Sequence, residues 1–188
     1  MILPIVMYGD PVLRAKCARV EKVDDETHQF VEDMMETMRD ANGVGLAAPQ
    51  VGVPIQLAIV DVSHDPECIT YLRIDGEDTA LEDAMPLVFV NPEIDPGEEK
   101  ETEAEGCLSF PDLRGDIRRP EAITARLTLL DGKTIEVETD GLLARAIQHE
   151  TDHLNGILFI DRMSSASKAS LRGKLKRMQK GYNKRVSR

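Results

Sequence analysis

Residues 140–156 read DGLLARAIQHETDHLNG. The Asp-Gly pair at the start and the Asn-Gly pair at the end bound an apolar pattern of helical period, so the stretch predicts one partly buried helix. On that helix His149 and His153 are four residues apart, and their imidazoles project from one face, where they can bind a single metal ion. Burying two histidines and two acids on such a segment costs free energy unless these side chains have binding partners. The stretch therefore predicts a metal-binding helix at the centre of the fold.

Glu150 follows His149 and is turned from it by about 100° around the helix. This rotation lets its carboxylate act on a metal-bound water without binding the metal. A third protein ligand must then come from elsewhere, which singles out Cys107 in the segment EGCLS, residues 105–109. The alternative interpretation takes the histidine pair as a solvated turn of helix and Cys107 as a small core residue.

The chain has 188 residues, 41% of them hydrophobic and 30% charged, which is typical of one globular domain with a full core. It contains no run of 18 apolar residues, so no membrane span is expected. Residues 1–7 lack the basic start of a leader and are expected to form a strand and a turn. Three cysteines without framework spacing indicate a reducing cytoplasm, and Cys17 and Cys68 are expected to be structural.

The charge is unevenly distributed. The net charge is −11, yet residues 164–188 contain nine Lys or Arg and no acid. This segment therefore carries +9 and the remainder of the chain −20. A basic tail on an acidic body is typical of an element that binds a polyanion. The alternative is a solvated surface helix.

Local signals divide the chain into short elements. In the first half we expect a helix capped by Asp24 or Asp25 and ended by Asn42-Gly43, an irregular loop over 43–52, a strand over 55–62 and an acidic surface loop or hairpin over 64–83. A strand over 87–94 and a hairpin of 123–130 and 134–138 around Asp131-Gly132 should follow. After the metal-binding helix we expect a short strand or extended link over 157–160 and a helix capped by Ser164 or Ser165.

Few crossover helices separate these strands, so the pattern predicts an α+β fold. Mixed or antiparallel sheets are expected to pack around the central metal-binding helix, with a helix at the C-terminus. The predicted organisation is a catalytic domain over residues 1–163 and a basic helical extension over 164–188. The apolar stripe of this extension is thin; it consists of Leu171, Leu175 and Met178.

Three sequence blocks occur in order. They are GVGLAAPQ at 43–50, EGCLS at 105–109 and QHETDH at 148–153. With these blocks the chain resembles the peptide deformylase family, over about residues 5–161. Each block alone is of limited specificity, but their order in a chain of this size is very specific.

The resemblance implies a role for each matched position. The implied metal ligands are Cys107, His149 and His153. Glu150 is implied as general base and acid, and Gln50 and the backbone N–H of Leu108 as donors to the oxyanion. Residues implied to bind substrate are Val44, Gly45 and Gly106 through the backbone, and Leu142 and Ala146 through a pocket for methionine.

The implied activity is metal-dependent hydrolysis that removes the N-formyl group from the formylmethionine of nascent polypeptides. The implied cofactor is one divalent metal ion, natively Fe²⁺, for which Zn²⁺, Ni²⁺ or Co²⁺ can substitute, because one Cys and two His suit several borderline metals. The implied partners are formylmethionyl peptides and, through residues 164–188, the ribosome and its RNA near the exit tunnel. We expect a cytoplasmic monomer.

Two other functions fit parts of the pattern. A metallopeptidase with the same helix motif usually takes a downstream third ligand, and no histidine follows His153. A non-catalytic, ribosome-associated peptide-binding protein would not need Glu150 and Cys107. Arg145 lies where an apolar pocket residue is expected, and is predicted to reach solvent or a substrate carbonyl. Asp152 is expected to pair with Arg118 or Arg119.

Overall fold

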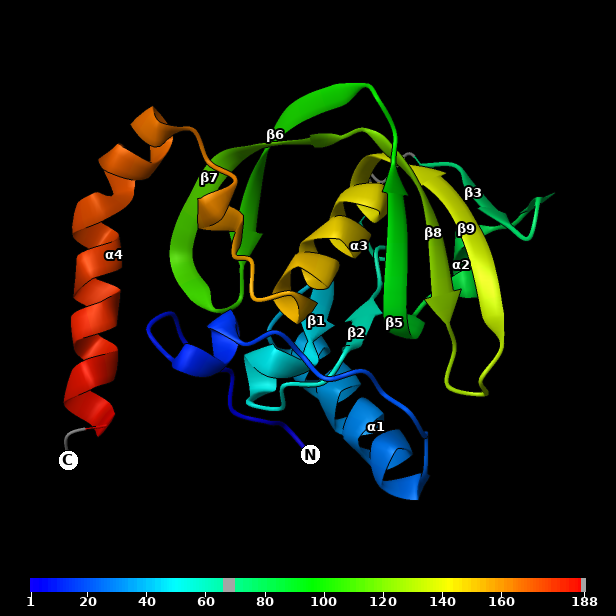
Figure 1. Cartoon of the computed structure of the whole chain (residues 1–188), viewed down its shortest axis with the longest axis horizontal. Coiled ribbons are helices and arrows are strands. Elements are labelled where there is room, and N and C mark those ends of the chain that lie inside the picture. The colour runs from blue at the N-terminus through cyan, green and yellow to red at the C-terminus, as the bar shows by residue number, and fades with distance from the viewer. Residues whose placement is uncertain (66–69, 187–188) are drawn as a thin grey trace.

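The structure, a computed structural model, describes residues 1–65 and 70–186. Helix α3 (Gly141–Leu154) lies between a seven-stranded antiparallel sheet and a separate two-stranded hairpin (Figure 1). The expected α+β architecture around a central helix is therefore confirmed. The large sheet has the strand order β1-β2-β5-β8-β9-β3-β4. Its strands are β1 (Gly45–Ala47), β2 (Leu57–Val60), β3 (Leu72–Ile74), β4 (Glu77–Asp78), β5 (Leu87–Pro96), β8 (Ala122–Thr128) and β9 (Thr134–Asp140).

The large sheet buries one face against α3. Along β9, Ile135, Val137 and Thr139 are buried and alternate with more exposed residues, and β8 shows the same period of two. The predicted Asp131-Gly132 turn joins these two strands, and Gly132 takes the positive φ of 85° that glycine tolerates at such a turn. The regular alternation explains why this hairpin was predictable from sequence.

Helix α3 is almost entirely inside the protein, since ten of its 14 residues are buried. Its apolar side chains Leu143, Ala144 and Ile147 pack into the main core with the sheet. The helix ends at the expected Asn-Gly signal, where the Asn155 side chain donates to the Thr151 carbonyl and Gly156 has φ of 71°. The histidine motif thus lies in the middle of a rigid, buried element.

Helix α1 (Asp25–Asp40) confirms the prediction for the N-terminal part. Asp24 caps it by accepting a hydrogen bond from the Thr27 N–H. Its Val31, Met34 and Met38 are buried in a second core cluster with residues of β1 and β2.

Three segments differ from expectation. Residues 43–52 are not irregular: they form β1 and the 3-10 helix η2 (Ala48–Val51), because β1 pairs with β2 and the Gln50 side chain accepts from the Ala47 N–H. Residues 1–7 form no strand. Residues 157–160 lead into the 3-10 helix η3 (Phe159–Asp161) instead of a strand. The acidic segment 64–83 agrees with one of its two predicted alternatives, because it contains the β3-β4 hairpin. Helix α2 (Leu81–Ala84) begins within this segment, and positions 66–69, including Cys68, lie outside the described residues.

The second sheet consists of β6 (Lys100–Cys107) and β7 (Phe110–Pro120). Against it lie the 3-10 helix η1 (Pro11–Arg14), η3 and the C-terminal helix α4 (Ser165–Val186), in a third core cluster. Ser164 caps α4, as predicted, by accepting from the Ser167 N–H. The thin apolar stripe of α4 packs here: Leu175 is 9% exposed and shares the cluster with Phe110 and Leu113 of β7.

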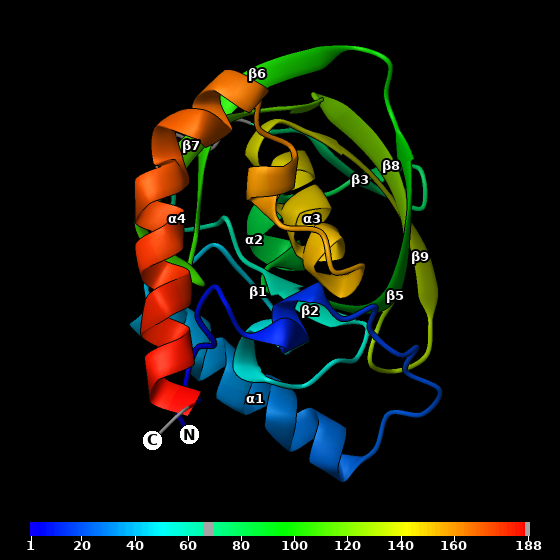
Figure 2. The ribbon, with the colours of Figure 1, turned by 60° about the vertical axis from the view of Figure 1, so that its left-hand side comes forward.

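Helix α4 stands along the outer side of the hairpin in both views (Figures 1 and 2). Near its end, Tyr182 lies against the turn at Gly9. In the described part of the chain, no helix combines the length and the apolar character needed to cross a membrane.

Candidate metal centre and substrate cleft

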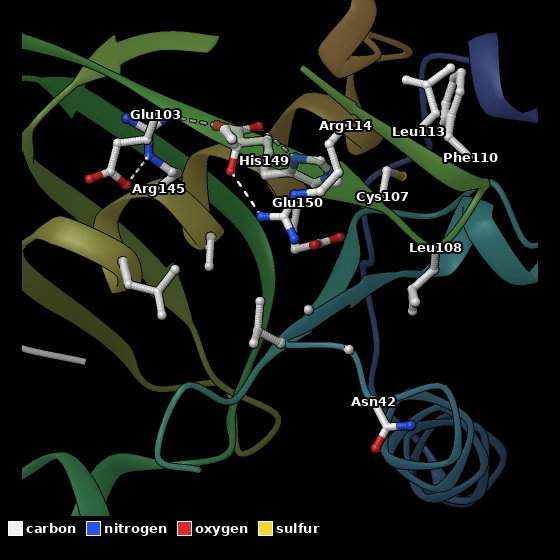
Figure 3. A pocket seen from close by; sticks show the side chains of 18 of the residues that line it. Asn42, Glu103, Cys107, Leu108, Phe110, Leu113, Arg114, Arg145, His149 and Glu150 are labelled. Carbon is white, nitrogen blue, oxygen red and sulfur yellow. Dashed lines mark hydrogen bonds and ion pairs between the residues drawn. The ribbon is translucent and has the colours of Figure 1, made fainter. Parts of the chain in front are cut away.

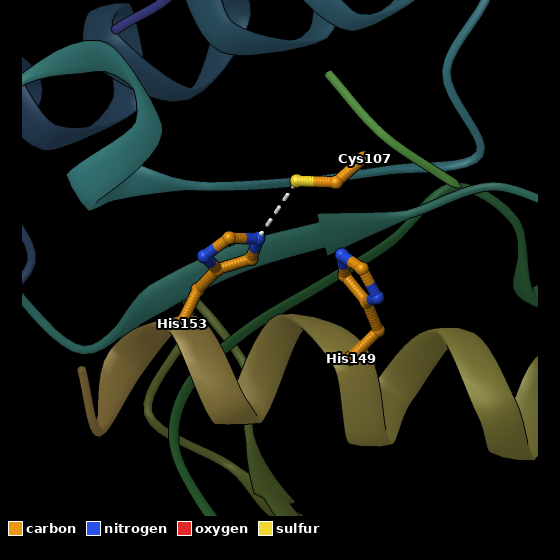
Figure 4. Close-up of side chains that lie close together, drawn as sticks. All are labelled: Cys107, His149 and His153. Carbon is orange, nitrogen blue, oxygen red and sulfur yellow. Dashed lines mark hydrogen bonds between the residues drawn. The ribbon is translucent and has the colours of Figure 1, made fainter. Parts of the chain in front are cut away.

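Three possible metal ligands meet above α3. One ligand atom from each of Cys107, His149 and His153 lies within 4.8 Å of the others. Figure 4 shows the two imidazoles rising from successive turns of the helix toward the cysteine. The Cys107 Sγ is 3.3 Å from Nε2 of His153. One thiolate and two imidazoles around a common point form a donor set that fits a divalent transition metal.

Two separate elements supply these ligands. The histidines come from α3, whereas Cys107 is the last residue of β6, immediately before the two-residue turn that leads into β7. The β6-β7 register shifts between Gly106 and Cys107. Such an irregularity re-aims a side chain next to a functional site. The cysteine therefore approaches the helix from the tip of the hairpin.

Glu105 contacts the His149 ring at its Nδ1 atom. Its Oε2 lies 3.0 Å from the His149 Nδ1, which leaves Nε2 to bind a metal. Burial alone would raise the pKa of Glu105, but hydrogen bonds from His149 and Arg119 outweigh burial and lower this pKa far below its usual value. Glu105 is thus a fixed anion that orients one ligand. Glu105 lies in one of the three sequence blocks, but no role was predicted for it.

The two histidines have different environments. Burial lowers the pKa of His153 well below its usual value, so this ring is neutral, as a metal ligand must be. Burial also acts to lower the pKa of His149, but hydrogen bonds with Cys107 and Glu105 outweigh it and raise this pKa. The surroundings of His149 therefore favour a positive charge, which a metal cation would supply.

Glu150 lies beside the ligands and against β1. Its carboxylate is buried, and Oε2 has no hydrogen-bond partner among the described residues. Burial raises the pKa of Glu150 to about 7, although nearby positive charge on His149 and Arg119 opposes this effect. A carboxyl group with a pKa near neutrality can both accept and donate a proton at physiological pH.

The Gln50 side chain is fixed between β1 and the hairpin tip. Its Oε1 accepts from the Ala47 N–H at 2.9 Å. This bond directs the amide nitrogen Nε2 toward the hairpin, 3.3 Å from Ser109 Oγ and 3.5 Å from the Cys107 Sγ. Gln50 therefore presents an N–H group next to the possible metal ligands, and Leu108 lines the same region.

These groups open into a cleft of about 620 Å³ between β1, α3 and the hairpin (Figure 3). The predicted substrate residues all line it, namely Val44, Gly45, Gly106, Leu142 and Ala146. Gln50, Cys107, Leu108, His149 and Glu150 also line it. The cleft therefore brings together all of these residues that were predicted from the sequence. Arg114 of β7 was not predicted; its guanidinium lies over the cleft and donates to the Ala104 carbonyl at 3.2 Å.

Two expectations for charged residues on α3 have clear outcomes. Arg145 does not reach solvent: it is 5% exposed and its guanidinium forms ion pairs with Glu105 and Glu101. The prediction that Arg145 reaches solvent, one of two alternatives, was wrong because these acids belong to β6, which only the tertiary fold brings to α3. Asp152 pairs with Arg119, as one of the two predicted alternatives stated, and also with Arg162.

The fold and this donor set, with a buried carboxylate beside it, define a metal-dependent hydrolase. The model of the polypeptide deformylase family matches residues 2–169, and the chain belongs to that family. A peptide deformylase of Opitutus terrae is 45% identical over 96% of this chain and 94% of its own length. One from Clostridium botulinum is 48% identical over 82% of this chain and 92% of its own length.

Solved structures give the same result. A plant peptide deformylase superposes with a TM-score of 0.85 at 34% identity, covering 99% of this chain and 94% of its own. A peptide deformylase from Synechococcus elongatus, in complex with actinonin, has a TM-score of 0.75 at 38% identity, covering 96% and 88%. The chain is therefore a metal-dependent deformylase acting on the N-termini of nascent formylated peptides. The metallopeptidase and non-catalytic alternatives are not favoured.

Proposed function

We propose that Cys107, His149 and His153 hold one divalent metal ion, and that Glu150 is the general base and acid for deformylation. The observation that carries this proposal is the convergence of three ligand atoms within 4.8 Å at the base of the cleft, beside the buried Glu150 carboxylate. A divalent metal bound there supplies Lewis-acid activation of water at neutral pH.

Glu150 has two tasks in this proposal. It accepts a proton from the attacking water and then transfers that proton to the amine that leaves when the formyl C–N bond breaks. Burial favours both tasks because it raises the pKa of the carboxyl group to about 7. The products are formate and a peptide with a free amino terminus.

Gln50 and Leu108 stabilise the negative charge that develops on the formyl oxygen. Gln50 Nε2 is held toward the hairpin tip by the Ala47 bond, so its donor needs no rearrangement during the reaction. The Leu108 N–H, in the turn after Cys107, is the second donor.

The substrate binds along β1. This strand is at the edge of the large sheet, so its free side can pair with an extended peptide through Val44 and Gly45. Gly106, on the hairpin wall of the cleft, approaches the peptide from the other side. Leu142 and Ala146 project from α3 into the cleft and receive the methionine side chain.

The native metal in this proposal is Fe²⁺, held by a cytoplasmic monomer. A thiolate ligand next to iron is oxidisable, so activity should be lost in air, and more slowly when Ni²⁺ or Zn²⁺ replaces iron. The test is anaerobic purification with metal analysis, followed by measurement of formate released from formyl-Met-Ala-Ser. One metal ion per chain with formate release supports the proposal, whereas metal-independent release refutes it.

Residues 164–188 form a second part of the proposal. They extend the catalytic domain of residues 1–163 and bring it to ribosomal RNA at the exit tunnel. Support comes from the charge of +9 on this segment and from the exposure of Arg172, Lys174, Lys176, Arg177 and Lys180 on α4.

A further inference from the structure

The position of Cys107 relative to His149 and His153 depends on side-chain contacts between the β6-β7 hairpin and α3. The hairpin that carries Cys107 forms its own two-stranded sheet and pairs with no strand of the large sheet in the described chain. Helix α3, which carries both histidines, packs instead on the large sheet. The geometry of the three ligands is therefore set by the contacts that hold the hairpin against the helix.

Arg145 makes the most extensive of these contacts. It lies one turn before His149, and its Nη1 donates to Glu105 Oε1 at 2.8 Å and to the Ile117 carbonyl at 3.1 Å. Its Nη2 donates to Glu101 Oε1 at 3.2 Å, and its Nε is 3.6 Å from Glu103 Oε2. A single guanidinium thus binds three alternate side chains of β6 and one carbonyl of β7. Figure 3 shows it beside Glu103 at one side of the cleft.

Glu105 connects Arg145 to the metal centre. Its Oε1 accepts from Arg145 and Arg119, and its Oε2 accepts from Arg119 and faces the Nδ1 of His149. Two arginines therefore fix the plane of this carboxylate. Because Glu105 is also two residues before Cys107 on β6, the same contact sets the height of the hairpin tip above α3.

We propose that Arg145 is a positioning residue for the metal centre: it sets the geometry of Cys107 and His149 through Glu105 and β6, without touching the metal or substrate. The proposal rests on the ligand set given under the proposed function. Its chemistry depends on the planar, multiply donating guanidinium, which a lysine ammonium cannot reproduce.

The test uses the full-length protein, stripped of metal and titrated with Co²⁺. Arg145→Lys keeps the positive charge but loses the planar contacts. We expect its Co²⁺ affinity to fall about tenfold, near the lower end for residues that support a metal ligand, and its thiolate-to-cobalt absorption band to change. Arg126→Lys is the matched control, because Arg126 on β8 forms an exposed ion pair with Glu93; its affinity and band should equal those of the wild type.

Arg145→Met separates position from charge. If Arg145 acted only by repelling the cation, Arg145→Met would bind Co²⁺ more tightly and Arg145→Lys would match the wild type. That pair of results would overturn the proposal, and so would an unchanged affinity and spectrum in both variants.

A double variant tests whether Arg145 affects metal affinity through Glu105, and this test remains possible if Arg145→Met does not fold. Because part of the effect of Arg145 passes through Glu105, the affinity lost by Glu105→Gln with Arg145→Lys should be smaller than the sum of the losses in the two single variants. Fully additive losses would overturn the proposal. Failure of the wild type to bind one Co²⁺ through a thiolate would instead refute the ligand set itself.

Discussion

Gly45 lies directly against Glu150: a methyl group added to the glycine would overlap Oε1 of the carboxylate. The strand that is proposed to bind substrate therefore touches the proposed general base. The atoms in the way, from Oε1 to Cγ, all belong to the Glu150 side chain and none to the backbone, so the protein can accommodate a larger residue by moving this side chain.

We expect Gly45→Ala to fold normally and to lose activity. The displaced carboxylate is out of place for proton transfer, and a misplacement of about 1 Å can cost about 100-fold in rate. Thermal unfolding and formate release measure the two effects. Gly181→Ala in α4 is the control for the substitution, since no atom lies within 4 Å of an added methyl group there and the φ of Gly181 is not in the left-handed region. A fully active Gly45→Ala would show that Glu150 tolerates displacement.

Cys107→Ala should lower metal content steeply, because one of three protein ligands is lost. The matched control is Cys17→Ala, which removes a buried thiol that is not part of the proposed ligand set. Metal per chain is measured after anaerobic purification of each protein. Full loading of Cys107→Ala would place the third ligand elsewhere.

Asp161 should contribute stability that depends on pH. Burial acts to raise its pKa, but hydrogen bonds from Arg14 and from the Leu158 N–H outweigh burial and lower the pKa below its usual value. A carboxyl group with a lowered pKa stabilises the fold above its ordinary pKa and loses this effect as the pH falls through the folded-state value.

Asp161→Asn should therefore unfold more easily than the wild type at pH 7, with a difference that shrinks below about pH 4. The effect is below about 1 kcal/mol, because the Arg14 pair is partly exposed. Urea unfolding at several pH values measures it. An equal difference at pH 7 and pH 3 would contradict the assigned cause.

The tail prediction concerns charge alone. Replacing Arg172, Lys174, Lys176, Arg177 and Lys180 by Gln should greatly weaken ribosome binding and leave turnover of small peptides within about threefold of normal, since these side chains are exposed and the stripe that packs on the hairpin is retained.

The affinity of the wild-type tail should fall steeply with salt, because phosphate contacts release counterions. Ribosome pelleting at several salt concentrations measures this. Equal binding by wild-type and neutralised proteins at moderate salt would show that residues 164–188 are only a solvated surface helix.

Local signals explain what the sequence could predict. Helix α3 has a clear period and an Asn-Gly end, and its two histidines need only helical spacing to share a face. The Asp131-Gly132 turn is equally local. By contrast, β1 exists because it pairs with β2 and because Gln50 reaches back to Ala47, and neither contact is visible in a stretch rich in glycine and proline.

The environment of Arg145 was missed for a related reason. Its partners lie on β6, some 40 residues away in sequence, and meet it only when the hairpin folds over α3. The alternation of Glu101, Glu103 and Glu105 was a readable signal that one face of this strand is acidic. It indicated that a cation should lie opposite, but not which one.

The central claim is that Glu150 transfers protons in a reaction that depends on the bound metal. The most direct measurement is formate release from formyl-Met-Ala-Ser by wild-type protein and Glu150→Gln, compared at equal metal content. Glu150 is not a ligand in this account, so the variant should keep its metal and lose about 10²–10⁴-fold in rate. A variant that carries full metal and releases formate at nearly the wild-type rate would contradict the account.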